Sequence, residues 1–323
     1  MSGYLFSDLP RLADTGDYTI AIRAVQDQLS VYNGLVSLYA IGGVSAPGIS
    51  DLDMVAVFQN NSIVAADPRK GLDDLSRYLF IHALYGASAE QFLQAQSFSF
   101  FRPYRLLHGE DLLAAKYVGN PAPEVRDQVA LEYLLKFYIS LAMQRTYRLL
   151  RVRSVLLNAK GAGIDLLHVA PESSTVQSFI SEVTELRSRW FSRPNPPLND
   201  FQDWFDRFCN WFFPFMTELF EKQVYYVPES RDYRMSKHLT LSPADRLSYT
   251  STGLRLPFLY PLIGRKYFNL LNRMNRIHFN VPSSSKSIPP AVMDYFEFNS
   301  LHRSYNRLHL PGYLPLTSSL HMR

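Results

Sequence analysis

Two carboxylates, Asp51 and Asp53, stand two residues apart at the start of an apolar run, within the segment IGGVSAPGISDLDMVAVF (41–58). Residues i and i+2 of a β-strand point to the same face, so the two carboxylates would lie side by side. Two like charges so close together are unfavourable unless a cation lies between them. Carboxylate oxygens are ligands that suit Mg²⁺ and Mn²⁺. The spacing therefore predicts a divalent metal site at Asp51 and Asp53; the alternative is a surface hairpin in which the two aspartates cap a turn.

The residues before the pair are of types that can hold phosphate groups. Gly42 and Gly43 end the preceding apolar run; glycines permit positive φ angles and a close approach of a ligand to the backbone. Their N–H groups can form a nest for an anion. Ser50 can donate its hydroxyl to a phosphate oxygen, or it can instead cap the turn. Metal ions held beside such a site could stabilise the attacking and leaving oxygens of a phosphoryl or nucleotidyl transfer.

Several strands and helices must position these residues. Apolar periodicity and turn residues predict strands over 35–41, 54–58 and 79–84, and helices over 17–32, 71–77 and 87–96. We expect Asp17 to cap the first helix, since aspartate is a preferred N-cap residue. Asn33 and Gly34 then stop that helix.

The rest of the chain is predicted to be mainly helical. Helices are expected over 124–151, 176–191, 200–221 and 263–276, and loops over 158–166 and 283–290. The sequence thus predicts an α+β fold: a small mixed-sheet domain over 1–118, a helical domain over 119–226, and a basic, aromatic-rich region over 227–323 that could pack on the other two.

The order strand, Gly-Gly, spacer, Ser-Asp-x-Asp, strand resembles the signature of nucleotidyltransferases of the polymerase-beta-like superfamily. The residues that carry the resemblance are Ile41-Gly42-Gly43 and Ser50-Asp51-Leu52-Asp53-Met54, and LLHGEDLLA (106–114) is similar to a segment of the aminoglycoside-type members. The resemblance covers roughly residues 15–115. It implies Mg²⁺ or Mn²⁺ at Asp51 and Asp53, phosphates bound by Gly42, Gly43 and Ser50, and an NTP substrate. The activity implied is transfer of a nucleoside monophosphate to a hydroxyl acceptor.

The sequence departs from this family at the third carboxylate, which members usually carry on a following strand. His82 stands at that place. It could be a metal ligand, the base that deprotonates the acceptor hydroxyl, or a half-buried strand residue without a catalytic role. Glu110 and Asp111 could supply the missing acid, or they could stabilise a helix start. Two functions therefore stay open: an active nucleotidyltransferase, and a catalytically degenerate member that binds a nucleotide, a nucleic acid or a partner.

Composition adds weaker constraints. The net charge is +4, and residues 229–323 carry 13 Lys or Arg against 5 Asp or Glu, a net charge of +8. This basic C-terminal region could bind an anionic acceptor or a nucleic acid, or it could be a solvated basic face.

The single cysteine, Cys209, excludes an intrachain disulfide framework. We expect Cys209 and the aromatic series of 204–220 to lie in the core. The first residues lack a secretion-signal pattern and the apolar runs are too short to span a bilayer, so we expect a soluble, cytoplasmic protein without membrane contact.

Overall fold

The computed structural model describes residues 3–98, 103–115, 121–192, 195–227, 238–264 and 266–316. The fold is α+β, as the sequence predicted. The chain forms two compact units, which we call the sheet unit (11–126 and 289–318) and the helical unit (1–10, 127–288 and 319–323). The sequence predicted three regions, over 1–118, 119–226 and 227–323, and this division into domains stays a prediction.

The sheet unit contains a four-stranded mixed sheet with the strand order β4-β3-β2-β5. Its strands are β2 (Leu35–Ile41), β3 (Asp53–Phe58), β4 (Tyr85–Ser88) and β5 (Tyr104–Gly109). β2 is antiparallel to both β3 and β5, while β3 and β4 are parallel. In the register, Asp53 lies opposite Ile41, and Ile41 lies opposite Tyr104. The strands predicted over 35–41 and 54–58 are therefore confirmed.

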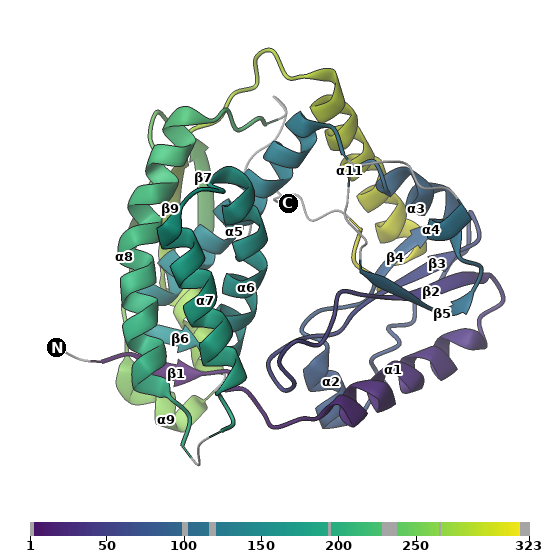
Figure 1. Ribbon diagram of the computed structural model, residues 1–323, viewed down its shortest axis with the longest axis horizontal. Helices are drawn as coiled ribbons and strands as arrows, with labels where there is room; N and C mark the ends of the chain where they lie inside the picture. Colours follow the sequence, from purple (N-terminus) through teal and green to yellow (C-terminus); the bar gives the residue numbers. More distant parts are fainter. Residues whose placement is uncertain are drawn as a thin grey trace. The chain divides into compact units, whose positions relative to one another are not determined.

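Helices cover both faces of this sheet (Figure 1). Helix α1 (Thr15–Ser30) packs on one face, where its Val25 and Leu29 join Met54 and Phe58 in a buried cluster. On the other face, the ring of Tyr39 stacks on Phe92 of α3 (Ala89–Ala95), with 5.2 Å between ring centroids. Strand β3 is consequently buried on both faces, which holds the carboxylate-bearing end of the strand rigidly.

The first helix begins two residues earlier than predicted. Asp14, not Asp17, is the N-cap, and its side chain accepts hydrogen bonds from the N–H groups of Gly16 and Asp17. Asp17 is the N3 residue of the same capping box, and its carboxylate accepts from the Asp14 N–H at 2.8 Å. Both positions of this capping box carry an aspartate, so the sequence alone does not show which of the two is the N-cap. The prediction of Asp17 as the N-cap is wrong.

The strand predicted over 79–84 is wrong. Helix α2 (Asp74–Leu79) occupies its start, and β4 begins only at Tyr85. The Asp73 side chain caps α2 by accepting from the N–H groups of Leu75 and Ser76, which favours helix here over the strand suggested by the apolar run. His82 therefore lies in the loop between α2 and β4, not in a strand.

A helix that the sequence did not predict, α11 (Pro290–His309), belongs to the sheet unit. The segment after it extends the sheet beyond β4: the Gly86 N–H donates to the Leu314 carbonyl at 2.9 Å, and the Leu314 N–H donates to the Leu84 carbonyl at 2.8 Å. The short helix α4 (Leu112–Ala115) completes this unit together with the first residues of α5.

The helical unit contains most of the remaining elements. They are β1 (Leu5–Ser7), α5 (Pro123–Tyr147), β6 (Leu149–Arg151), α6 (Val152–Val169), α7 (Ser174–Ser188), α8 (Leu198–Lys222), β7 (Leu239–Pro243), β8 (Ser248–Thr252), the 3-10 turn η1 (Pro257–Leu259), α9 (Tyr260–Ile263), α10 (Lys266–Met274) and β9 (Arg276–Val281). The strands pair as β1-β6 and as β7-β9-β8. The loop predicted over 158–166 is wrong, because these residues lie within α6. Gly163 there allows a close approach to Ile180 of α7, since a Cβ would lie 3.1 Å from that side chain.

Aromatic side chains fill the core of the helical unit, as predicted. Trp204, Phe208 and Phe212 of α8 stack in sequence, with 5.1 Å between successive ring centroids. Cys209 is fully buried beside them. Among the residues that the structure describes, no helix is long and apolar enough to cross a membrane.

Candidate metal site

The loop that carries Asp51 is fixed to the sheet unit by two tyrosines. The Tyr18 hydroxyl donates to the Ser50 carbonyl at 2.6 Å and accepts from the Gly48 N–H at 3.1 Å. The Tyr78 hydroxyl donates to the Gly48 carbonyl at 2.5 Å. Neither tyrosine was singled out from the sequence, because both lie on helices far from the loop in the chain. Together they hold the residues before Asp51 in one conformation.

Asp51, Asp53 and His82 come together at one end of β3. Each offers a possible ligand atom for a metal, and these three atoms all lie within 4.8 Å of one another. Asp53 is the first residue of β3, and Asp51 precedes it by two residues. His82 lies in the loop before β4, the parallel neighbour of β3. The Leu52 N–H donates to the Leu79 carbonyl at 3.0 Å, which ties the two aspartates to the end of α2 and so to this loop. Elsewhere in the described part of the chain, no other such group of three side chains occurs.

The orientation of the His82 ring is set by the backbone. Its Nδ1 lies 2.8 Å from the Ala83 carbonyl oxygen, so Nδ1 carries a proton and donates it. Its Nε2 lies 3.0 Å from Asp53 Oδ1. This oxygen is buried and, among the described residues, has no hydrogen bond of standard geometry. In a neutral ring, the Nε2 lone pair would face this carboxylate oxygen, which is unfavourable, and a positive charge on Nε2 would make the contact favourable. The Tyr85 hydroxyl also lies 3.5 Å from Nε2.

The pKa of His82 reflects these neighbours. Burial lowers the pKa, and this is the largest single influence. The contact with the Asp53 carboxylate, the hydrogen bond to the Ala83 carbonyl, and the charges of Asp53 and Asp51 act in the opposite direction. Together they outweigh burial, so the pKa is raised above its ordinary value. A proton can thus supply the positive charge that the two carboxylates favour.

A metal ion can supply the same charge, and the donor set fits one. Histidines that ligate metals usually donate their second N–H to a backbone carbonyl or a carboxylate, as His82 does to Ala83. Two carboxylates and one imidazole suit Mn²⁺, Zn²⁺ or Fe²⁺, whereas Mg²⁺ prefers oxygen ligands alone. The residues present therefore fit a transition-metal dication better than Mg²⁺.

The predicted phosphate-binding residues lie at the same end of the sheet. Gly42 follows Ile41, the register partner of Asp53, and has a φ of 74°. Its N–H donates to the Pro103 carbonyl at 2.8 Å. A Cβ added at either Gly42 or Gly43 would meet nothing within 4 Å, so the space in front of both residues is open.

Ser50 is a turn residue in this structure. It is 3% exposed, and its Oγ accepts from the Ala46 N–H at 3.1 Å. Its own N–H donates to the Ala46 carbonyl. This is the turn-capping role that the sequence left open, and a contact of the Ser50 hydroxyl with a phosphate stays a prediction.

The two acids considered as substitutes for the third carboxylate lie at a helix start. Asp111 Oδ1 accepts from the N–H groups of Leu113 and Ala114 in α4, at 3.2 and 3.1 Å. The Glu110 carbonyl accepts from the hydroxyls of Ser37 and Tyr39. The structural role expected for Asp111 is therefore confirmed. Neither acid belongs to the cluster of Asp51, Asp53 and His82.

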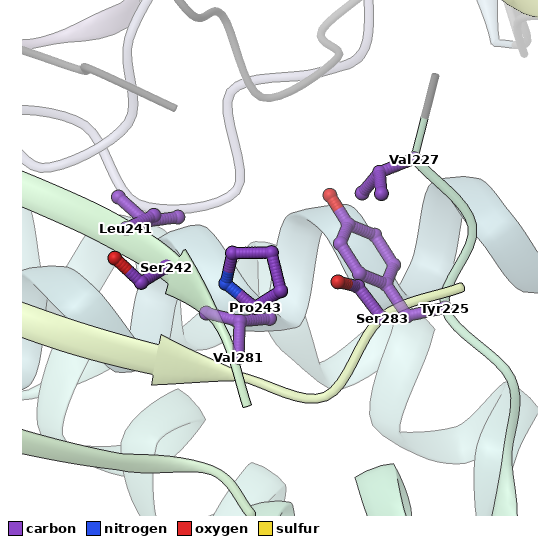
Figure 2. A pocket seen from close by; sticks show the side chains of 7 residues that line it. All are labelled: Tyr225, Val227, Leu241, Ser242, Pro243, Val281 and Ser283. Atoms are coloured by element: carbon purple, nitrogen blue, oxygen red, sulfur yellow. The ribbon is translucent and has the colours of Figure 1, made fainter. Parts of the chain in front are cut away.

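The helical unit contains a small apolar pocket, shown in Figure 2. It is lined by residues of β7 and β9 and by neighbouring segments, namely Tyr225, Val227, Leu241, Ser242, Pro243, Val281 and Ser283. Its volume of about 10 Å³ is no more than one water molecule needs. This pocket is therefore a packing feature and not a ligand site.

Comparisons of the chain with protein-family models, with curated proteins and with solved structures found no match.

Proposed function

We propose that this chain is a metal-dependent nucleotidyltransferase, which moves a nucleoside monophosphate from an NTP to a hydroxyl acceptor. The observation that carries the proposal is the meeting of Asp51, Asp53 and His82 within 4.8 Å, at the end of a mixed sheet and beside the Gly42–Gly43 turn. The resemblance of residues 41–54 to the polymerase-beta-like signature supports the same reaction. The cluster and the segment that carries the resemblance lie at the same end of the sheet, where β2 ends and β3 begins.

Asp51, Asp53 and His82 would hold the metal ion. A dication there would neutralise charge on the phosphates and on the leaving pyrophosphate oxygen. Because the donor set includes an imidazole, we propose that the metal is Mn²⁺. Mg²⁺ suits this set less well, since it prefers oxygen ligands. The buried Asp53 Oδ1, which lacks a hydrogen bond of standard geometry among the described residues, supports a cation in contact with this oxygen.

The remaining residues of the site would orient the nucleotide. The open space before Gly42 and Gly43 leaves room for phosphate oxygens close to the backbone. The Gly42 N–H is already donated to Pro103, so the Gly43 N–H is the better candidate for a phosphate contact. Tyr18 and Tyr78 would act as positioning residues, because they fix the loop before Asp51.

The reaction breaks the bond between the α-phosphorus and its bridging oxygen to the β-phosphate. It forms a bond from that phosphorus to the acceptor oxygen and releases pyrophosphate. The acceptor hydroxyl loses its proton, and His82 Nε2 or an Asp51 or Asp53 oxygen could accept it. His82 cannot take this proton while its Nε2 holds a metal, so the two roles of His82 are alternatives.

A second function is favoured by the composition of the cluster. It contains two carboxylates and an imidazole, where the resembled family usually has three carboxylates. A chain with this set could bind a metal and a nucleotide without turnover. The two functions share the metal site and differ in whether pyrophosphate is released.

The experiment that tests the proposal measures pyrophosphate release from each of the four NTPs, with Mn²⁺ or Mg²⁺. The acceptors offered are an amino sugar, an unstructured protein and the 3′ end of an RNA. The proposal expects release that depends on metal and is lost in Asp53→Asn but kept in Asp27→Asn, a matched change at an exposed carboxylate of α1. Metal-dependent NTP binding without release from any acceptor would favour the non-catalytic function. Release that survives Asp53→Asn would contradict both.

A further inference from the structure

A second cavity of the helical unit has a polar lining, and no residue of the proposed metal site belongs to it. Its volume is about 350 Å³, within the usual range for small-molecule sites. It is formed by the end of α5, by β8 and the segment after it, and by the residue between α10 and β9. Nine residues line it, among them Arg145, Arg148, Arg255, Ser251, Thr252 and Asn275.

Three arginines of this cavity have no carboxylate partner among the residues that the structure describes. Arg145 donates to the neutral Asn210 amide oxygen at 3.1 Å and lies over the Phe213 ring. Arg148 lies over the Tyr4 ring, with 4.9 Å from its guanidinium carbon to the ring centroid. Neither these two nor Arg255 forms an ion pair with any described residue. Other arginines of the same unit do: those at 151, 189, 207 and 246 each lie within 4 Å of an Asp or Glu oxygen.

The backbone around the cavity is held in costly conformations. Arg148 has a φ of 53°, in the left-handed region that side chains other than glycine rarely adopt. The Arg148 N–H donates to the Arg145 carbonyl. This strained turn therefore links the two arginines, which are three residues apart in the chain. Helices often end in this conformation, but with glycine. A strained arginine beside two other arginines without a carboxylate partner indicates that the position of its side chain matters.

The opposite rim is rigid. Asn275 is buried, and its amide donates to the carbonyls of Leu254 and Leu271, at 3.1 and 2.8 Å. Gly253 has a φ of 140°, and a Cβ there would lie 2.4 Å from Asn275 Oδ1. Only glycine fits this close approach, so the segment that carries Arg255 is fixed against α10. The cavity is therefore preorganised.

We propose that this cavity binds a small molecule carrying two or more phosphoryl groups. Three like charges around one cavity repel each other, and a multivalent anion relieves that repulsion. Guanidinium groups match the geometry of phosphate oxygens, and the hydroxyls of Ser251 and Thr252 can donate further hydrogen bonds. The proposal is independent of the metal site, since none of the nine lining residues belongs to the sheet unit.

Inorganic pyrophosphate is the probe that tests it. Calorimetry would measure its binding to the full chain carrying Asp51→Asn and Asp53→Asn, in EDTA, so that a metal-bound complex at the other site cannot contribute. We expect one binding site, with affinity that falls as salt rises. Arg148→Gln and Arg255→Gln should each weaken binding by about tenfold, because a hydrogen bond between charged groups is lost.

Arg246→Gln is the matched control. It removes the same charge from the same unit, at an exposed arginine 3.5 Å from Glu221. Affinity unchanged in Arg246→Gln and reduced in the two cavity variants, with equal melting temperatures, supports the proposal. No pyrophosphate binding, or an equal loss in the control, overturns it. Citrate that binds as tightly as pyrophosphate would overturn the preference for phosphoryl groups.

Discussion

His82 Nε2 lies 3.0 Å from Asp53 Oδ1, while His82 Nδ1 lies 2.8 Å from the carbonyl oxygen of Ala83. The backbone thus fixes which nitrogen faces the carboxylates. A positive charge between that nitrogen and Asp53, from a proton or from a metal ion, makes this contact favourable. This contact joins the loop before β4 to the first residue of β3.

Replacing His82 by aspartate should change the preferred metal. His82→Asp gives a site with three carboxylates, which suits Mg²⁺ better than the present set. We expect the ratio of Mn²⁺ to Mg²⁺ affinity, measured by calorimetry, to fall by roughly tenfold. His82→Asn is the control, because it supplies one neutral oxygen without the added charge. A ratio that is unchanged in His82→Asp would show that His82 is not a ligand.

Removing the Tyr18 hydroxyl should loosen the loop before Asp51. Tyr18→Phe leaves the Ser50 carbonyl and the Gly48 N–H without this partner in a buried position. The expected cost is about 1–3 kcal/mol in the free energy of unfolding, with weaker metal binding. Tyr32→Phe is the matched change, since the Tyr32 hydroxyl makes no hydrogen bond among the described residues. Denaturant unfolding and a Mn²⁺ titration measure both effects; equal behaviour of the two variants would contradict the positioning role.

Gly109 should not tolerate a side chain. It has a φ of 83°, and a Cβ there would lie 1.9 Å from the Val36 carbonyl oxygen. Gly109→Ala should therefore lower the free energy of unfolding by more than about 3 kcal/mol, or prevent folding. Gly43→Ala provides the comparison, because its Cβ would meet nothing within 4 Å. Gly43→Ala should change stability by less than about 1 kcal/mol, and a large loss there would contradict the open space at the site.

The stability of the sheet unit should fall as the pH decreases, partly because of His302. This residue is fully buried in α11, with Nδ1 3.0 Å from Gln91 Oε1 and Nε2 accepting from the Leu316 N–H at 2.9 Å. Burial lowers the pKa of His302 to about 4. The unfolded chain, with a histidine pKa near 6.5, then takes up the proton first. The contribution is full above about pH 6.5 and is lost progressively as the pH falls from about 6.5 to about 4.

The size of this loss can be bounded. A difference of about 2.5 pKa units corresponds to about 3 kcal/mol at most. Denaturant unfolding at pH 7.5 and pH 4.5, for the natural chain and for His302→Gln, isolates the effect. The variant should be less stable at pH 7.5 but lose less stability on acidification. A pH dependence identical in the two proteins would contradict a buried neutral His302.

Local sequence patterns predicted the centre of the sheet well. The apolar runs of β2 and β3 have their own periodicity, and the two glycines and two aspartates mark the ends that meet in the structure. The third strand was misplaced because Leu79-Phe80-Ile81 has strand composition, while the capping by Asp73 and the packing of Leu79 against α1 produce a helix there. His82 was nevertheless identified, since its place in the order of elements did not depend on the strand's exact bounds.

Other features could not be read from local patterns. Helix α11 joins the sheet through residues more than 200 positions away in sequence, such as the bond from the Asn306 amide to the Gly86 carbonyl. The hydrogen bond that orients His82 is made by a backbone carbonyl, which has no sequence signature. The cavity with three arginines combines a helix end with strand β8, and the charge count of residues 229–323 indicated only one of these arginines.

The most direct test of the metal site is a calorimetric titration of Mn²⁺, followed by an NTP, into the natural chain and into the Asp51→Asn, Asp53→Asn double variant. We expect Mn²⁺ binding and Mn²⁺-dependent NTP binding in the natural chain, and loss of both in the double variant. Asp27→Asn should bind both as the natural chain does. Binding of Mn²⁺ and NTP by the double variant with undiminished affinity would contradict the assignment of Asp51 and Asp53 as the metal ligands.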